Sequence, residues 1–243
     1  MYLKSPGHAT FGLALLFAAA CSTAMPWHNE PIGLEVNLAF VIRNNLLYLP
    51  GATIDGHSGS FLLGSAEPQS VLDSHFVQKV GPMPFHSLQL SERDSLRFTP
   101  VVLDLRGVGD GIVGADVWGS HAVTIDYRAG LLTFQREGIH PELMNVYSYR
   151  DAPSINVEVD GRLVPAIVDT SSPDTLVLPR EAAAAERRSA HIQIAGTDLG
   201  SVDIRLADVA RPRIGNRLLS KFLVTIDYGR RQVGLFRDPR ISL

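Results

Sequence analysis

The sequence repeats itself, and this repeat limits the possible fold more than any other feature of the chain. The run VTIDY occurs at 123–127 and again at 224–228. Upstream, FLLGSAEPQSVL at 61–72 aligns with AIVDTSSPDTLV at 166–177. Because the segments recur in the same order, we expect two similar units of about a hundred residues each.

Within each unit the residue pattern predicts β-strands. Asp55-Gly56 and Asp160-Gly161 stand at matching places and are flanked by apolar and β-branched residues, as a two-residue hairpin turn requires. After the second pair, the apolar run at 163–168 predicts a buried strand. The 21 glycines and 15 prolines favour many short strands over long helices. We therefore predict an all-β fold of two pseudo-symmetric β-barrel lobes with short helices.

Local signals also predict two of these helices and the domain boundaries. Asp73 is a suitable N-cap for a helix that follows it, and Pro179 suits the first turn of another. Residues 138–153 have a proline near each end, Pro141 and Pro153, and are expected to connect the lobes. The predicted organisation is a signal peptide at 1–20, an N-terminal lobe at 21–137, a linker at 138–153 and a C-terminal lobe at 154–243.

The amino terminus has the pattern of an export signal. Lys4 precedes an apolar run at 11–20, which is too short to span a bilayer. Cys21 follows three alanines, and this arrangement resembles the lipobox of bacterial lipoproteins, whose cysteine is acylated after cleavage. We therefore expect an outer-membrane lipoprotein that faces the periplasm and is held to the membrane through Cys21. The alternative is ordinary signal cleavage near Ala20 or Ala24, which leaves Cys21 a free thiol.

Charge and residue counts exclude several classes of function. With 22 Lys and Arg against 25 Asp and Glu, the net charge of −3 argues against nucleic acid as a partner. The single cysteine rules out an intramolecular disulfide framework and a cysteine metal cluster. The eight histidines show no metal-ligand spacing, so we expect neither a metal nor another cofactor.

The second unit carries AIVDTSSPDTLVL at 166–178, which resembles the active-site strand and turn of retropepsin-like and pepsin-like aspartic peptidases. In that family two apolar residues precede Asp-Thr-Gly, and a Thr-x-Leu stretch follows. Downstream, RIGN at 213–216 and the second VTIDY resemble the other half of the family pattern, and IVGAD at 112–116 with the first VTIDY repeats it. The resemblance covers nearly the whole exported chain and implies an aspartic-peptidase fold.

The resemblance also implies a pair of carboxylates, one from each lobe, with a water between them. Because two like charges so close cannot both ionise, one carboxylate acts as general base while the other acts as general acid. Asp169 matches the motif position in the second lobe, but Gly64 stands there in the first. The nearest carboxylates by sequence that could supply the second group are Asp174, Glu67 and Asp73.

Residues beside the motif aspartate keep part of the family pattern. The resemblance implies that the hydroxyls of Thr170 and Ser65 cross-link the two loops. The third motif position, usually glycine, is Ser171 in the second lobe and Ala66 in the first, and a Cβ there can crowd a substrate. A different interpretation of Asp169 is that it survives as a hydrogen-bonding support of an inherited fold.

Two functions from different classes therefore remain open. The first is an aspartic-type endopeptidase that acts on an extended peptide or protein in the cleft between the lobes, with Asp169 as the principal carboxylate. The second is a non-catalytic cell-envelope protein that binds an extended peptide in the same cleft. We expect a monomer, because the first lobe already occupies the place of a partner copy, and a dimer that pairs two Asp169 residues would need a domain swap.

Other polar residues have simpler interpretations. Asp55, Asp160, Asp126 and Asp227 stand where turns are expected, and aspartate is a common turn former. The run Ser58-Gly59-Ser60 lacks the Gly-x-Ser-x-Gly frame of a nucleophile elbow.

Overall fold

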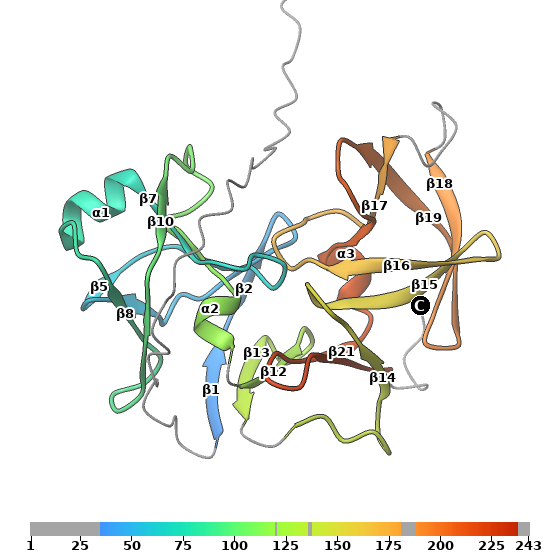
Figure 1. Ribbon diagram of the computed structural model, residues 1–243, viewed down its shortest axis with the longest axis horizontal. Coiled ribbons are helices and arrows are strands. Elements are labelled where there is room, and N and C mark those ends of the chain that lie inside the picture. The colour runs from blue at the N-terminus through green and yellow to red at the C-terminus, as the bar shows by residue number, and fades with distance from the viewer. Residues whose placement is uncertain (1–34, 120, 136–137, 181–187, 238–243) are drawn as a thin grey trace, which may run out of the picture.

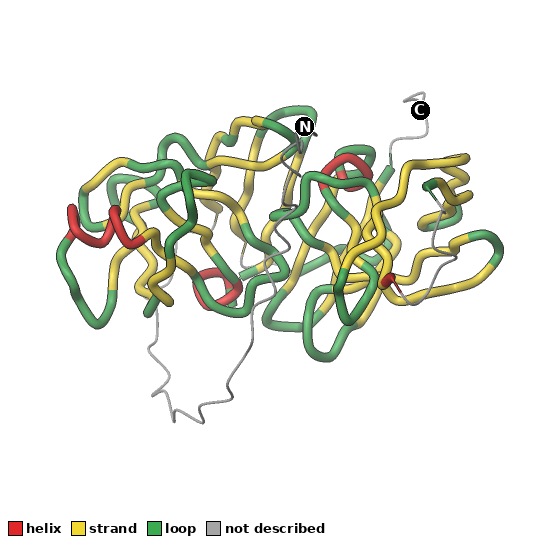
Figure 2. The backbone as a smooth tube through the Cα atoms, turned by 90° about the horizontal axis from the view of Figure 1, so that it is seen from above, coloured by secondary structure: helices red, strands yellow, loops and turns green. Residues whose placement is uncertain are grey.

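The computed structural model describes residues 35–119, 121–135, 138–180 and 188–237, and these residues form mostly β-structure. Within these ranges there are twenty-two strands and three short helices, which confirms the all-β class. Figure 1 shows the N-terminal half, residues 35–135, beside the C-terminal half, residues 154–237. Seen from above, strands and loops make up most of an elongated molecule (Figure 2).

One six-stranded sheet joins the two halves. Its order is β1 (Glu35–Ala39), β13 (Leu131–Gln135), β12 (Ala122–Asp126), β21 (Leu223–Asp227), β22 (Gln232–Phe236) and β14 (Asn145–Ser148). At its centre β12 pairs antiparallel with β21, and Thr124 stands opposite Thr225. The hydroxyl oxygens of these two threonines are 2.8 Å apart. The two VTIDY runs are therefore direct neighbours.

Two further sheets form the rest of the N-terminal half. One has the order β10 (Val101–Leu103), β7 (Val71–Asp73), β11 (Gly111–Val113), β6 (Phe61–Leu63), β3 (Leu46–Tyr48) and β2 (Val41–Arg43). The other has the order β5 (His57–Ser58), β4 (Thr53–Ile54), β8 (His86–Gln89) and β9 (Ser95–Phe98). Strands β6 and β11 are parallel, with Leu63 opposite Val113.

The strands of the C-terminal half close into a barrel. Around it run β15 (Ser154–Val159), β16 (Arg162–Val168), β20 (Arg213–Ile214), β17 (Leu176–Pro179), β19 (Thr197–Ala207) and β18 (Ser189–Ile194). Strands β16 and β20 are parallel, with Val168 opposite Ile214. This pairing matches that of β6 with β11, because both join the segment before a motif position to the segment before Gly114 or Gly215.

The prediction of two barrels is wrong for the N-terminal half, whose described strands lie in the central sheet and in two open sheets. In the N-terminal half, the segment that corresponds to β16 is divided into two strands, β5 and β6. Strand β5 pairs with β4, while β6 pairs with β11. At the break the Ser60 N–H donates to the Asp110 side chain (2.7 Å) instead of to a strand. A Cβ on Gly59 would lie 2.6 Å from the Phe61 ring, so that ring fills the space beside the chain.

Both predicted hairpin turns form. Asp55-Gly56 joins β4 to β5, and Asp160-Gly161 joins β15 to β16. All four residues have positive φ, between 46° and 79°, as a two-residue turn of this kind requires. The carboxylate of each aspartate accepts a hydrogen bond from a backbone N–H of a neighbouring strand, from Ser87 (2.9 Å) and from His191 (2.8 Å) respectively.

Short helices follow the strands at three places. They are α1 (Ser74–Val80), α2 (Ala115–Trp118) and α3 (Asn216–Leu219). Asp73 caps α1 as predicted, because its side chain accepts from the His75 backbone N–H (2.9 Å). The helix predicted after Pro179 falls on residues 181–187, and these lie outside the described residues. Within the predicted linker, β14 adds a strand to the central sheet.

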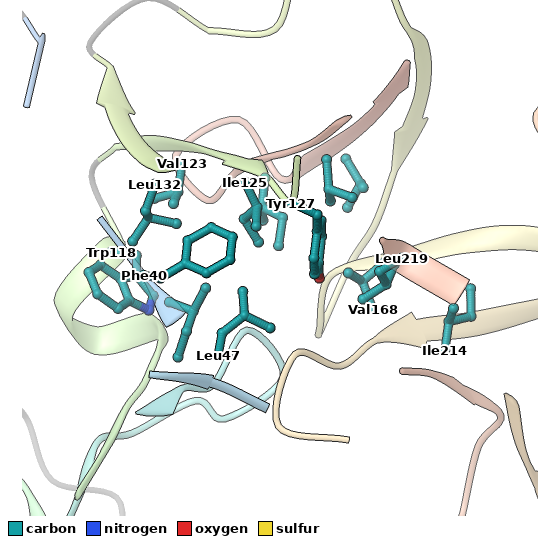
Figure 3. Close-up of a cluster of buried hydrophobic side chains, with 14 of the residues drawn as sticks. Phe40, Leu47, Trp118, Val123, Ile125, Tyr127, Leu132, Val168, Ile214 and Leu219 are labelled. Atoms are coloured by element: carbon teal, nitrogen blue, oxygen red, sulfur yellow. The ribbon is translucent and has the colours of Figure 1, made fainter. Parts of the chain in front are cut away.

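A single core of buried apolar side chains runs through both halves. Figure 3 shows Trp118 and Leu132 in one part of it and Val168 with Leu219 in another, with Tyr127 between them. Each large apolar side chain that is fully buried contributes about 1.5–3 kcal/mol. The two halves therefore stabilise each other, and the loops at their junction rest on this shared core.

Candidate active site

The two motif positions lie in loops that meet at the junction of the halves. We call residues 64–67 the first loop, which follows β6, and residues 169–172 the second loop, which follows β16. The Gly64 N–H donates to the Val113 carbonyl and the Asp169 N–H donates to the Ile214 carbonyl, both at 2.9 Å. Each loop thus leaves its sheet in the same way.

A reciprocal cross-link joins the two loops. Ser65 Oγ donates to the Val168 carbonyl (2.7 Å) and accepts from the Thr170 N–H (3.0 Å). Thr170 Oγ1 donates to the Leu63 carbonyl (2.7 Å) and accepts from the Ser65 N–H (2.9 Å). Both residues are buried. The four bonds hold each hydroxyl against the backbone of the opposite loop.

A buried tyrosine, a half-buried tyrosine and one buried asparagine support the loops. Tyr228 donates to the Ser65 carbonyl (3.1 Å), and Asn216 Nδ2 donates to the Thr170 carbonyl (2.7 Å). The Asn216 carbonyl oxygen in turn accepts from Tyr127 OH (2.8 Å). Burial raises the pKa of both tyrosines, so each keeps the proton that it donates. Each tyrosine closes one of the VTIDY runs, so the repeated run itself supports the loops.

Asp169 lies within this frame and is almost fully enclosed. Its side chain is 3% exposed. One oxygen, Oδ1, accepts from the Ser171 backbone N–H (3.0 Å) and from Ser171 Oγ (2.6 Å). The other, Oδ2, forms an ion pair with Arg213 Nη1 at 2.9 Å. Ser171, at the third motif position, therefore holds the Asp169 carboxylate through both its backbone N–H and its side-chain hydroxyl.

Gly64 has no space for a side chain of its own. A Cβ at this position would lie 2.5 Å from Ile112 Cγ2, 3.0 Å from Glu67 Cγ and 3.4 Å from Glu67 Cβ. The first loop reverses direction here, with the Glu67 N–H donating to the Gly64 carbonyl (3.3 Å). Glu67 therefore folds back over the glycine that stands at the motif position.

Glu67 is also the carboxylate that responds to Asp169. Burial raises the pKa of Glu67 above its ordinary value of 4.5, the charge of Asp169 raises it further, and the charge of Arg213 lowers it. Asp174 instead pairs with Arg205 (2.7 Å), and Asp73 caps α1. Of the three candidates for a second carboxylate, Glu67 is the one whose pKa responds to the charges of Asp169 and Arg213.

A pocket of about 390 Å³ lies beside the first loop, at the junction of the halves. Its lining includes Ser65 and Ala66 of the first loop together with Tyr149, Arg150 and Tyr228. Its lining includes neither Asp169 nor Glu67. An occupant of this pocket would contact Ala66, the third motif position of the first lobe.

The remaining sequence candidates have structural roles. Asp126 accepts from the Arg128 and Ala129 N–H groups, and Asp227 accepts from the Arg230 N–H (2.7 Å), so both cap turns as predicted. In the ranges that the structure covers, no group of three or more His, Cys, Asp or Glu residues is placed to hold a metal ion. Cys21 lies outside the described residues. No helix within the described ranges is long and apolar enough to cross a membrane.

Sequence reasoning missed Arg213 as a neighbour of Asp169. The signal was present in the alignment of the repeats, where Arg213 stands opposite Ile112 directly before the Ile214 and Val113 positions. Because β20 runs parallel to β16, this position places the side chain beside the motif residue.

In a comparison with models of known protein families no model matches the chain, and a comparison with characterised proteins finds no match.

Proposed function

We propose that this protein is an exported aspartic-type endopeptidase of two pseudo-symmetric lobes, with Asp169 as the principal carboxylate. Its substrate is an extended peptide or protein bound between the lobes, and it uses no metal or other cofactor. The protein is a monomer held to the outer membrane through acylated Cys21 and faces the periplasm. The carrying observation is the reciprocal cross-link between Ser65 and Thr170 directly beside Asp169.

The register of the central sheet supports the pseudo-symmetry. Thr124 and Thr225 occupy the same place in the two VTIDY runs and stand opposite each other in an antiparallel pair. Such a pair is related by a local twofold axis that passes between the two threonines. The matched pairings of β6 with β11 and of β16 with β20 extend the same relation to the strands that carry the loops.

The geometry around Asp169 supports a carboxylate with a set orientation. Ser171 and Arg213 fix both oxygens, and the cross-link fixes the loop that carries them. A general base must be held in place relative to the water that it activates. In this proposal Asp169 takes a proton from a water molecule as the water attacks the scissile carbonyl.

Peptide hydrolysis by the purified protein tests the proposal. A mixed library of unstructured peptides is incubated between pH 3 and pH 8, and new termini are identified by mass spectrometry. We expect cleavage that falls at least about 100-fold in Asp169→Asn, the lower end of what a general base contributes. Asp203→Asn, at an exposed position on β19, is the matched control and should cleave normally. Equal cleavage by wild type and Asp169→Asn would reject Asp169 as the base.

The ion pair with Arg213 favours a second function, a non-catalytic peptide-binding protein of the cell envelope. Arg213 occupies one oxygen of Asp169 and Ser171 occupies the other, so an attacking water has to compete with both donors. For this function the same library should bind without cleavage, and binding should survive Asp169→Asn. Isothermal titration with the library peptides distinguishes it from the peptidase.

A further inference from the structure

We propose that Glu67 supplies the second carboxylate of the site and acts as the general acid opposite Asp169. This inference rests on the proposed peptidase function. The first loop lacks a carboxylate at its motif position because Gly64 stands there. Glu67 comes three residues later, and its Cβ and Cγ lie 3.0–3.4 Å from where the missing Cβ of residue 64 would be. Its side chain thus begins within 3.4 Å of where an aspartate at position 64 would begin.

The backbone holds Glu67 in this place. The Glu67 carbonyl accepts from the Ala115 N–H (2.7 Å), which ties the residue to the start of α2. In the second loop, the Ser172 carbonyl accepts from the Asn216 N–H (2.9 Å) in the same way. Glu67 and Ser172 are therefore equivalent positions, and the first loop differs by carrying a carboxylate where the second carries a hydroxyl.

The surroundings of the two carboxylates differ. Asp169 forms an ion pair with the guanidinium of Arg213 at 2.9 Å. The pKa of Glu67 is raised by burial and by the charge of Asp169, although Arg213 lowers it in part. A carboxyl whose pKa is raised keeps its proton to higher pH, which is what the general acid of such a pair requires.

The reaction balances with these two groups alone. The Asp169 carboxylate takes a proton from water while the water oxygen bonds to the scissile carbon, and the carbonyl oxygen takes the proton of Glu67. The product is a diol, with Asp169 protonated and Glu67 ionised. Asp169 then gives its proton to the amide nitrogen, the C–N bond breaks, and one diol hydroxyl returns a proton to Glu67. An amine and a carboxylic acid leave, and both side chains are restored.

Rates of cleavage as a function of pH test the assignment. Glu67→Gln keeps the shape of the side chain but removes the acid, and kcat should fall at least about 100-fold with little change in KM. Glu67→Asp should recover part of the rate. Glu158→Gln is the matched control, because Glu158 is half-buried on β15 and should leave the pH profile unchanged. In wild type, cleavage should decline as the pH rises through the pKa of Glu67, since the acid must be protonated.

The outcomes separate this inference from the function on which it rests. If Asp169→Asn is inactive and Glu67→Gln cleaves like wild type, Glu67 is not the acid although the peptidase stands. If wild type cleaves nothing, both proposals fail. Carbon NMR titration of the Glu67 carboxyl adds a readout that needs no catalysis. Its midpoint should move to lower pH in Asp169→Asn, and an unchanged midpoint overturns the coupling between the two groups.

Discussion

Replacing Ser65 by alanine measures how strongly the cross-link holds the two loops together. In wild type, Ser65 Oγ donates to the Val168 carbonyl and accepts from the Thr170 N–H, and only 1% of Ser65 is exposed. The alanine variant leaves both backbone groups buried without these partners, and each such group costs about 1–3 kcal/mol. We therefore expect the free energy of unfolding to fall by about 2–6 kcal/mol, a large share of the roughly 5–15 kcal/mol typical of a folded protein.

Urea unfolding followed by tryptophan fluorescence gives this free energy directly. The melting temperature should fall by at least about 4 °C, since 1 kcal/mol corresponds to about 2–4 °C for a chain of this size. Thr170→Ser keeps both hydrogen bonds of its hydroxyl and should cost only about 1 kcal/mol for the lost methyl. Ser95→Ala, at an exposed position on β9, is the control. A cost for Ser65→Ala no larger than that of Ser95→Ala would refute the argument that the cross-link carries the junction.

Three further predictions use the same protein. Gly64→Ala should lower the free energy of unfolding by about 1–3 kcal/mol in urea, because its Cβ would lie 2.5 Å from Ile112 Cγ2; an unchanged midpoint would contradict this. The raised pKa of Glu67 means that the folded state keeps a proton which the unfolded state loses above pH 4.5, so stability should fall as the pH rises from there to the raised pKa. Thermal melts of Glu67→Gln should show a flatter profile than wild type, whereas parallel profiles would count against the shift. Cys21→Ser should move the protein from the membrane to the soluble exported fraction, and unchanged fractionation would favour ordinary secretion.

Features that depend on a few adjacent residues were predicted correctly from the sequence. The hairpin turns at Asp55-Gly56 and Asp160-Gly161 need positive φ at both positions, and aspartate with glycine supplies it locally. The cap of α1 needs only Asp73 and the next two residues. Such signals act over a single turn, so they hold whatever the rest of the chain does.

Features that depend on how distant strands pair were missed or wrong. Arg213 and Asp169 are 44 residues apart in the sequence. They meet because β20 runs parallel to β16. In the N-terminal half the chain leaves one sheet after β5 and enters another at β6, and Gly59 lies between them with the Phe61 ring close to it. The composition of a strand does not show which strand it pairs with, so the break in the first half could not be derived from the residue pattern, and Arg213 could be found only by aligning the two repeats.

The first loop differs from the second at Gly64 and Glu67, whose side-chain positions lie close together. This closeness affects whether an aspartate can be introduced at position 64 to form an aspartate pair with Asp169. A Cβ on residue 64 would lie 2.5 Å from Ile112 Cγ2 and 3.0 Å from Glu67 Cγ, so an aspartate there requires these side chains or the backbone to shift. Ile112 stands at the position where the second half carries Arg213. Gly64→Asp should therefore place a carboxylate in the first loop only if Ile112 and Glu67 move, and a Gly64→Asp variant as stable as wild type would contradict this packing argument.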